Sequence, residues 1–174
     1  ALVMNAGYSR YPRQHNGIGD ITLEVRAMDK AGQKKVFARE ELQFSYRQSN
    51  LADWIILSAR LGSWRRPQDD IAHEMKANLN HRNLKQDFTY PSCGSFFKNP
   101  QGGYPSAGEL IETAGLKGLR VGDAMVSQRH ANFIINVGSA KTTEILELMQ
   151  KIQKAVFDAN EILLDPEVRI ITKP

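Results

Sequence analysis

The sequence predicts an α+β protein in two unequal parts, a β-rich part at residues 1–62 and an α+β part at residues 63–174. In the first part, apolar and polar residues alternate along residues 21–27, the period of a half-buried strand. In the second part, apolar residues recur at helical spacing through residues 145–159. Glycine, proline and arginine gather at residues 62–67 between them, as is typical of a junction.

The first part reads as a run of short strands. Four alternating apolar residues predict one face of the first strand: Ile21, Leu23, Val25 and Ala27. Turn residues at 29–32 then lead into a returning strand at 34–37, and a short polar helix is expected around 39–42. Residues 54–61 predict a further strand, with Ile55 and Leu57 on one face.

The second part opens with a helix and a long loop. Ile71, Met75 and Leu79 recur at helical spacing, and Asp69 and Asp70 suit the positive end of the helix dipole. Residues 80–103 are polar and aromatic, and we expect a loop there.

Two helices and two strands are expected to follow. Ser106 and Glu109 form a capping-box pattern for a helix that Gly115 closes. A buried strand at 132–137 precedes the long helix, whose apolar stripe predicts a core-packing face. A last strand is expected at 162–171, where Pro166 favours an edge or a bulge.

Composition limits the classes of function. With 41% hydrophobic and 24% charged residues, the 174-residue chain has the composition of a soluble globular protein. No apolar run approaches the roughly 20 residues of a membrane span. Cys93 is the one cysteine, which excludes an intrachain disulfide and suits a reducing cytoplasm. The net charge of +4 suits an anionic partner, either nucleic acid or a phosphorylated small molecule. The one tight basic cluster, Arg65-Arg66, reads as a solvated linker, which disfavours nucleic acid.

The common catalytic motifs are missing. The four histidines share no zinc-ligand spacing, and one cysteine cannot complete a structural site. Gly17-Ile18-Gly19 begins like a dinucleotide fingerprint but lacks the third glycine. No P-loop and no nucleophile elbow occurs.

The apolar opening at Ala1 suggests a segment cut from a longer chain.

Four segments carry polar residues in glycine-rich or strained surroundings, at residues 4–8, 44–49, 91–100 and 165–169. Taken alone, each has a structural explanation, such as a plain turn or a surface pair. Together and in this order, they resemble the UDP-N-acetylenolpyruvoylglucosamine reductase family. The resemblance continues through residues 107–112, 115–118, 126–136 and 167–171, and its most specific motif is Gly-Ser-Phe-Phe-Lys-Asn-Pro at 94–100.

The resemblance implies a flavoenzyme of peptidoglycan synthesis that uses FAD and NADPH. Residues 1–62 would be the end of a FAD-binding domain, and residues 63–174 the UDP-sugar substrate-binding domain. A hydride added to the enolpyruvyl ether leaves an enolate-like anion, which must be stabilised and then protonated. The resemblance assigns protonation to Ser95, an active-site cation to Arg47 and a catalytic carboxyl group to Glu167. Because an ionised carboxylate would oppose the anion, Glu167 is expected to be protonated or hydrogen-bonded at that moment. The Ser95 alkoxide would need stabilising neighbours, for which Lys98 and backbone N–H groups are candidates.

Binding residues follow from the same match. The flavin-approaching segment is Asn5, Ala6 and Gly7, where glycine permits close backbone contact. The residues matched to the UDP-sugar are Tyr46, Arg82, Lys98, Asn99, His130 and Arg169. For His130, an ordinary hydrogen-bonded histidine is an equally good interpretation. We expect a cytoplasmic monomer with no nucleic-acid, membrane or metal partner.

The match also fails in places. The family's amino-terminal FAD domain would precede Ala1, and without it flavin binding should be weak and catalysis negligible. Gln86-Asp87 stands where a Gln-Pro pair is usual, and residues 8–16 depart from the common continuation. Residues 54–67 are too short for a mobile tyrosine-bearing loop, which indicates the family's shorter form. A flavin-less UDP-sugar-binding module is the alternative function.

Overall fold

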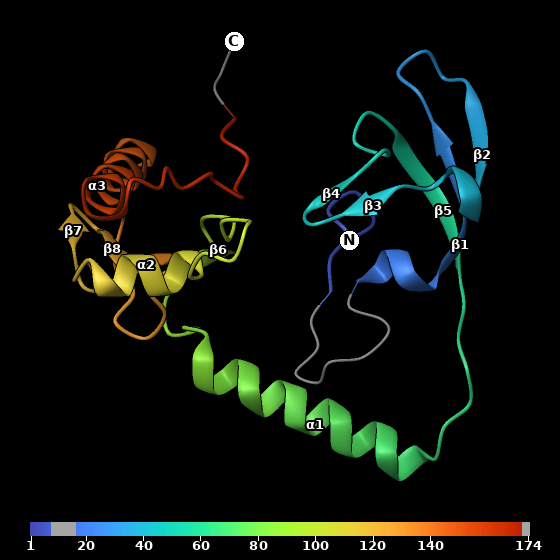
Figure 1. Ribbon diagram of the computed structural model, residues 1–174, viewed down its shortest axis with the longest axis horizontal. Coiled ribbons are helices and arrows are strands. Elements are labelled where there is room, and N and C mark those ends of the chain that lie inside the picture. Colours follow the sequence, from blue (N-terminus) through green and yellow to red (C-terminus); the bar gives the residue numbers. More distant parts are fainter. Residues whose placement is uncertain (8–16, 172–174) are drawn as a thin grey trace. The chain divides into compact units, whose positions relative to one another are not determined.

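The computed structural model describes residues 1–7 and 17–171, and Figure 1 shows the order of the elements. The chain divides into two compact units, Ala1–Asn78 and Leu79–Pro174, which are described separately. The α+β class is confirmed by their sheets and helices. The division falls inside helix α1, whereas a domain boundary after residue 62 stays a prediction.

The first unit is mostly β-structure. Its elements are η1 (Ile18–Ile21), β1 (Thr22–Met28), β2 (Lys34–Ala38), η2 (Arg39–Glu41), β3 (Phe44–Ser45), β4 (Gln48–Ser49) and β5 (Ile55–Leu61). Strands β2, β1 and β5 form an antiparallel sheet in that order, and β3 and β4 form a separate hairpin. The expected β1–β2 hairpin, the short polar helix and the later strand are confirmed.

The face of β1 differs from the expected one at its start. Val25 and Ala27 are fully buried as expected, but Leu23 is 42% exposed and Thr22 is fully buried. The register against β5 shifts between Thr22 and Glu24, which are opposite the consecutive residues Leu61 and Arg60. Leu23 is therefore the extra residue of a bulge, and a bulge reverses the faces on either side of it.

The second unit combines a four-stranded sheet with helices. Its elements are the end of α1 (Gln68–Lys85), β6 (Ser92–Ser95), α2 (Ala107–Thr113), β7 (Arg120–Val121), β8 (Ala124–Val126), β9 (Phe133–Asn136) and α3 (Thr142–Asn160). The antiparallel sheet has the order β6-β9-β8-β7. The helix capped by Ser106, the strand at β9 and the long helix are confirmed.

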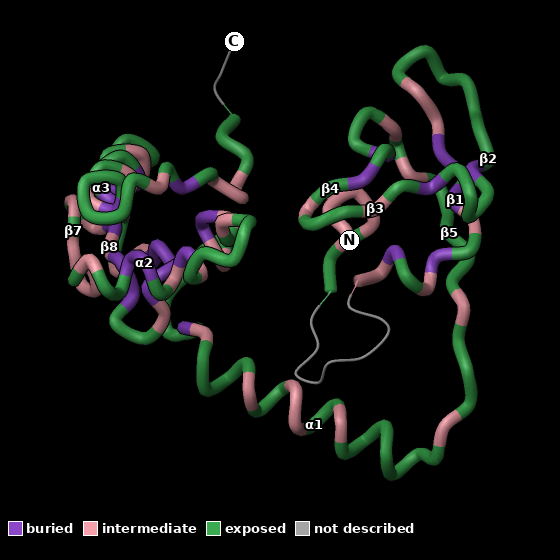
Figure 2. The backbone as a smooth tube through the Cα atoms, viewed as in Figure 1, coloured by how far each residue is buried: buried purple, intermediate pink, exposed green. Residues whose placement is uncertain are grey.

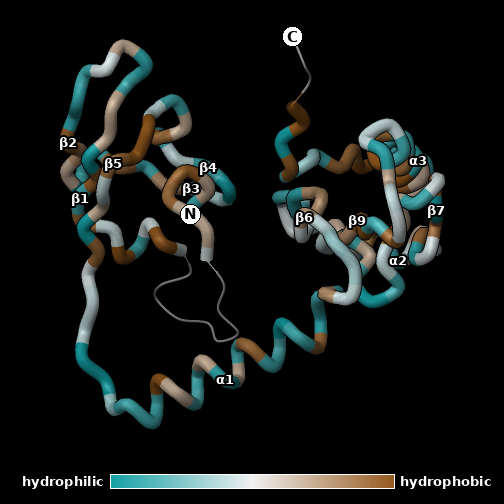
Figure 3. Tube along the Cα trace, turned by 180° about the vertical axis from the view of Figure 1, so that it is seen from behind, coloured by the Kyte–Doolittle hydropathy of each residue, from teal (hydrophilic) through white to brown (hydrophobic). Residues whose placement is uncertain are grey.

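The core of the second unit lies between α2, α3 and the sheet (Figure 2). The stripe on α3 supplies four buried side chains to it: Leu148, Met149, Ile152 and Val156. The coil after α3 adds Leu164, which is fully buried. Figure 3 shows the alternation of hydrophilic and hydrophobic residues along α3 that produces this stripe.

Two expectations about residues 80–103 are corrected. Helix α1 continues to Lys85, because residues 80–85 contain no glycine or proline and basic residues suit its last turn. Residues 92–95 form strand β6 rather than a loop. The apolar residues of α1 do not mark a core, since Ile71, Met75 and Leu79 are all exposed and none of its residues is buried.

The expected last strand at 162–171 is wrong. The described part of this segment makes one isolated antiparallel bridge, Phe97 to Pro166, and no ladder. Pro166 has no N–H to donate, which limits pairing at the centre of the segment. Among the described residues, no helix is long and apolar enough to cross a membrane.

Candidate functional site

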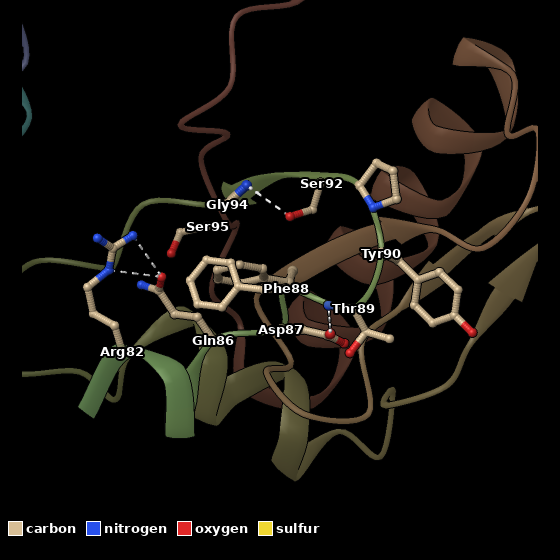
Figure 4. Close-up of a pocket in the computed structure, with 11 residues that line it drawn as sticks. Arg82, Gln86, Asp87, Phe88, Thr89, Tyr90, Ser92, Gly94 and Ser95 are labelled. Atoms are coloured by element: carbon tan, nitrogen blue, oxygen red, sulfur yellow. Dashed lines mark hydrogen bonds between the residues drawn. The ribbon is translucent and has the colours of Figure 1, made fainter. Parts of the chain in front are cut away.

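A pocket of about 580 Å³ opens in the second unit, at the end of α1 and along β6. Its walls are Arg82, Gln86, Asp87, Phe88, Thr89, Tyr90, Pro91, Ser92, Gly94, Ser95 and Phe133. Two of the residues expected from the sequence, Ser95 and Arg82, therefore line one pocket. Figure 4 shows the Ser95 side chain on the same side of the pocket as the Arg82–Gln86 pair.

Arg82 supplies the cation of this pocket. Its Nε and Nη2 atoms both donate to Gln86 Oε1 at 3.4 Å, and its guanidinium lies 5.8 Å from the centre of the Phe88 ring. These contacts orient the side chain, while Arg82 as a whole remains exposed to solvent. An oriented, solvent-exposed guanidinium is suited to an anionic ligand.

Ser95 ends strand β6 next to a backbone irregularity. It pairs with Phe133 of β9, and the register shifts between Ser92 and Ser95. Gly94 has φ +80°, a conformation that side chains disfavour, so a glycine is required to turn the strand just before Ser95. The half-buried Ser95 is thereby placed in the pocket wall.

The backbone after Ser95 is fixed on both sides. On one side, Asn132 Oδ1 accepts from Phe97 N at 2.9 Å and Asn132 Nδ2 donates to Phe97 O at 2.8 Å. On the other side, Lys98 N donates to Asp165 O and Glu167 N donates to Phe96 O, both at 2.8 Å. The structure thus brings the Glu167 segment beside the residues that follow Ser95.

These hydrogen bonds narrow the possible partners of a Ser95 alkoxide. Phe96 N donates to Asn132 O at 2.8 Å, and the N–H groups of Phe97 and Lys98 are also occupied. The backbone N–H groups of 96–98 are therefore committed elsewhere. The Lys98 ammonium and the backbone N–H groups before Phe96 stay as the candidates.

Lys98 and Asn99 belong to the same 94–100 motif as Ser95, but their described contacts are with other parts of the second unit. Lys98 Nζ forms an ion pair with Asp165 Oδ2 at 2.6 Å. Asn99 Oδ1 accepts from Ala107 N at 3.1 Å, at the start of α2. Neither residue lines the pocket as described, and their contact with substrate stays a prediction.

His130 and Arg169 also lie outside the pocket lining. His130 Nδ1 accepts from Asn132 N at 3.2 Å, and its ring centre is 4.5 Å from that of Phe133. Burial lowers the pKa of His130, which favours the neutral imidazole. Arg169 is exposed in the coil that follows Glu167.

The first unit gathers the remaining candidates. Tyr46 and Arg47 form the tip of the β3–β4 hairpin, with the Arg47 guanidinium 5.1 Å from the centre of the Tyr46 ring. Arg47 has φ +55°, which is unusual for a residue other than glycine. Such backbone strain often accompanies a functional residue.

Asn5 joins the amino-terminal segment to this hairpin. Its Nδ2 donates to Ser45 O at 3.3 Å, and its Oδ1 accepts from Gly19 N at 2.9 Å. Ala6 and Gly7 follow in the chain and are exposed, while Ala6 N donates to Ala1 O and Ala6 O accepts from Ile18 N, both at 3.0 Å. Asn5 thus holds the amino-terminal segment against the arginine hairpin, while residues 8–16 lie outside the described residues.

Two residues that line or frame the pocket were missed by the sequence reasoning. Asn132 and Asp87 are both buried and hydrogen-bonded, at 4% and 7% exposure. A polar residue directly before the apolar run of β9 was a usable signal for Asn132, whereas Asp87 stood out only as a departure from a motif. Among the described residues, no three histidine, cysteine or acidic residues gather as a metal site.

Comparisons with known proteins point to one enzyme family. Residues 86–171 match the family model described as "UDP-N-acetylenolpyruvoylglucosamine reductase, C-terminal domain". The chain is 39% identical over 173 residues to the UDP-N-acetylenolpyruvoylglucosamine reductase of Caldanaerobacter subterraneus, covering 98% of this chain and 55% of the relative. It is 45% identical to the Chlamydia muridarum protein of that name, again covering 98% and 55%.

A solved structure is also similar. The crystal structure of UDP-N-acetylenolpyruvylglucosamine reductase from Thermus caldophilus superposes with a TM-score of 0.80 at 37% identity. The match covers 97% of this chain and 58% of that one. The chain thus spans a little over half the length of the relatives it matches.

Proposed function

Because the chain belongs to the UDP-N-acetylenolpyruvoylglucosamine reductase family and carries its carboxy-terminal domain, we propose that it acts in the reductase step of peptidoglycan biosynthesis. The substrate would be UDP-N-acetylenolpyruvoylglucosamine, and the product UDP-N-acetylmuramate. The observation that carries the proposal is the placement of Ser95 and Arg82 in one pocket, with the Glu167 segment bonded beside Ser95.

The proposed cofactors are FAD and NADPH. When bound, FAD reduced by NADPH supplies the hydride. The exposure of Ala6 and Gly7, next to the Asn5-bound hairpin, supports close approach of the flavin to this segment. Asn5 contributes by holding the hairpin, because its amide oxygen and nitrogen both have protein partners.

Four side chains would carry the chemistry on the substrate. The fixed positive charge of Arg47 stabilises the carboxylate as negative charge grows on it. Ser95 protonates the carbon next to that carboxylate, and the Lys98 ammonium stabilises the resulting alkoxide. Glu167 takes part in its protonated form or through a hydrogen bond, since a bare carboxylate would oppose the anion.

The diphosphate of the substrate would be held by cations. Arg82 is the best supported, because it is oriented at the pocket and exposed. Arg169, Lys98, Asn99, Tyr46 and His130 complete the proposed binding set. His130 receives the least support, because its Nδ1 and its ring face already have structural partners.

The test uses the longest natural chain that contains these residues. We expect a yellow protein with flavin absorbance at about 450 nm that oxidises NADPH only when the UDP-enolpyruvyl sugar is present. A colourless protein that binds UDP-sugars would contradict the proposal and favour a binding module. NADPH oxidation that ignores the UDP-sugar would contradict the proposed substrate.

A further inference from the structure

We propose that Asp87 is a positioning residue for the UDP-sugar pocket and acts through a hydrogen bond to Ser127, here called the Asp87–Ser127 bridge. This inference rests on the proposed function. It adds a residue for which the sequence predicted no role.

The Asp87 carboxylate is engaged at both oxygens. Oδ2 accepts from Ser127 Oγ at 2.6 Å, and Oδ1 accepts from Thr89 N at 3.0 Å. Asp87 is 7% exposed and lines the pocket. Figure 4 shows the bond to Thr89, which closes the turn that carries Phe88.

The hydrogen bonds of Ser127 require a hydrogen-bond acceptor as its partner. Its Oγ accepts from Arg129 N at 3.0 Å and from His130 N at 3.2 Å, and the residue is fully buried. A hydroxyl group has one proton, and with both acceptor positions used that proton must be donated. Asp87 accepts this hydrogen bond, so the Asp87–Ser127 bridge joins the segment after α1 to the turn after β8.

The bridge connects the segment that carries Asp87 to the turn before Phe133, and both Asp87 and Phe133 line the pocket. Asp87 directly follows Gln86, the acceptor of both Arg82 hydrogen bonds. On the other side, Ser127 holds the turn at His130, whose ring packs on Phe133 in the pocket lining. Phe133 pairs with Ser95, so contacts link the bridge to Arg82 through Gln86 and to Ser95 through Phe133.

The ionised form of the Asp87 side chain is also favoured. The Ser127 hydroxyl is the largest influence that holds the pKa of Asp87 below its usual value, and the Thr89 N–H and the Arg129 charge act in the same direction. The carboxylate is therefore ionised at neutral pH, as the hydrogen bonds require.

The first experiment replaces the carboxylate by an amide in the longest natural protein. Ser127 and Thr89 donate to different oxygens of Asp87, so in Asp87→Asn one of these donors faces the new amide group. We expect KM for the UDP-enolpyruvyl sugar to rise about tenfold, with kcat and NADPH reduction of the flavin nearly unchanged.

The matched control is Asp123→Asn. Asp123 also has a lowered pKa and accepts a backbone N–H, from Ser139 at 2.8 Å, but it lies outside the pocket lining. Its KM should equal that of the unchanged protein. Equal KM effects in the two variants, or no effect of Asp87→Asn, would overturn the positioning role.

A second experiment needs no variant. Because coupling between sites is reciprocal, UDP-sugar binding should slow hydrogen exchange at the Arg129 and His130 amides more than at the Ser139 amide. If saturating UDP-sugar changed the exchange rates of all three amides equally, the proposal would be overturned, even if Asp87→Asn failed to fold.

The two proposals fail in different ways. If the unchanged protein binds no UDP-sugar, the proposed function is wrong, and the substrate-pocket role falls with it. The bridge itself would still be tested, because Asp87→Asn should speed exchange at Arg129 and His130 without any ligand. A variant that binds the sugar normally despite that faster exchange refutes only the positioning role.

Discussion

At the scale of single residues, backbone conformation explains why particular side chains stand where they do. Gly94 turns β6 so that Ser95 lines the pocket, and Arg47 occupies a left-handed position at a hairpin tip. The sequence indicated both residues through a family motif. It could not indicate their φ angles, which depend on strand pairing elsewhere in the chain.

Replacing Gly94 by alanine should destabilise the second unit through strain alone. Gly94 has φ +80°, and a Cβ added there would meet no atom within 4 Å. We expect a loss of about 1 kcal/mol in the free energy of unfolding for Gly94→Ala, and a smaller loss for Gly94→Asn, because asparagine tolerates this conformation better. Urea denaturation measures both, and equal losses would contradict the explanation by strain.

The His130 imidazole should make stability depend on pH. Burial lowers its folded pKa from 6.5, so the unfolded chain takes up a proton first as the pH falls. Its contribution is complete above 6.5 and is lost as the pH decreases from that value toward the folded pKa. Unfolding free energies measured at pH values of about 7.5 and 5.5 should differ less in His130→Gln than in the unchanged protein.

The lowered pKa of Asp87 acts in a more acid range and does not interfere with that measurement. Its contribution is present above 3.8 and is lost as the pH falls below that value. A His130→Gln variant with the same pH dependence as the unchanged protein would show that the imidazole is not the group responsible.

At the scale of elements, the sequence predicted the regular helices and strands well and the irregular segments poorly. The stripe on α3, the Ser106 cap of α2 and the strand at β9 follow directly from local sequence. The strand predicted at 162–171 was wrong because the described part of this segment forms no ladder. Its fully buried residue is Leu164, which anchors it in the core. The prediction that Leu23 is buried was wrong because a bulge depends on the partner strand, which the sequence of β1 does not specify.

Asn132 is the side chain that fixes the element carrying Ser95. In Asn132→Asp, a carboxylate oxygen would replace the amide nitrogen that donates to Phe97 O. Two buried oxygens would then face each other, and we expect a loss of about 3 kcal/mol in the free energy of unfolding.

The control for this change is Asn136→Asp. There the described hydrogen bonds use only the amide oxygen, which accepts from Gly138 N and Ala140 N at 3.0 and 2.9 Å. We expect a change of about 0.5 kcal/mol or less, because a carboxylate keeps both bonds. Similar losses in the two variants, measured by thermal or chemical unfolding, would contradict the role of the Asn132 amide nitrogen.

At the scale of the whole molecule, the residues with proposed roles are distributed over the two compact units. Ser95, Arg82 and Glu167 belong to the second unit, whereas Arg47 and the Asn5 segment belong to the first. The sequence could assign these residues to one reaction only through the family resemblance. Strand spacing and helix periodicity hold no information on contacts between distant segments.

A chain limited to residues 1–174 should separate binding from turnover. The pocket lies wholly within the second unit, so UDP should still bind to this chain in a calorimetric titration. We expect no UDP-sugar-dependent oxidation of NADPH, because residues 1–174 span only 55% of the Caldanaerobacter relative. Loss of UDP binding in Arg82→Ala, with binding kept in Arg60→Ala on strand β5, would assign the binding to the pocket.

The most direct test of the central claim is a single-turnover measurement on the longest natural protein, reduced with NADPH under anaerobic conditions. Adding UDP-N-acetylenolpyruvoylglucosamine should restore flavin absorbance at about 450 nm and yield UDP-N-acetylmuramate. With Ser95→Ala, product formation should slow by about 100-fold or more, while Ser92→Ala, on the same strand and in the same pocket, should react normally. Full-rate product formation in Ser95→Ala, or no reaction in the unchanged protein, would contradict the account.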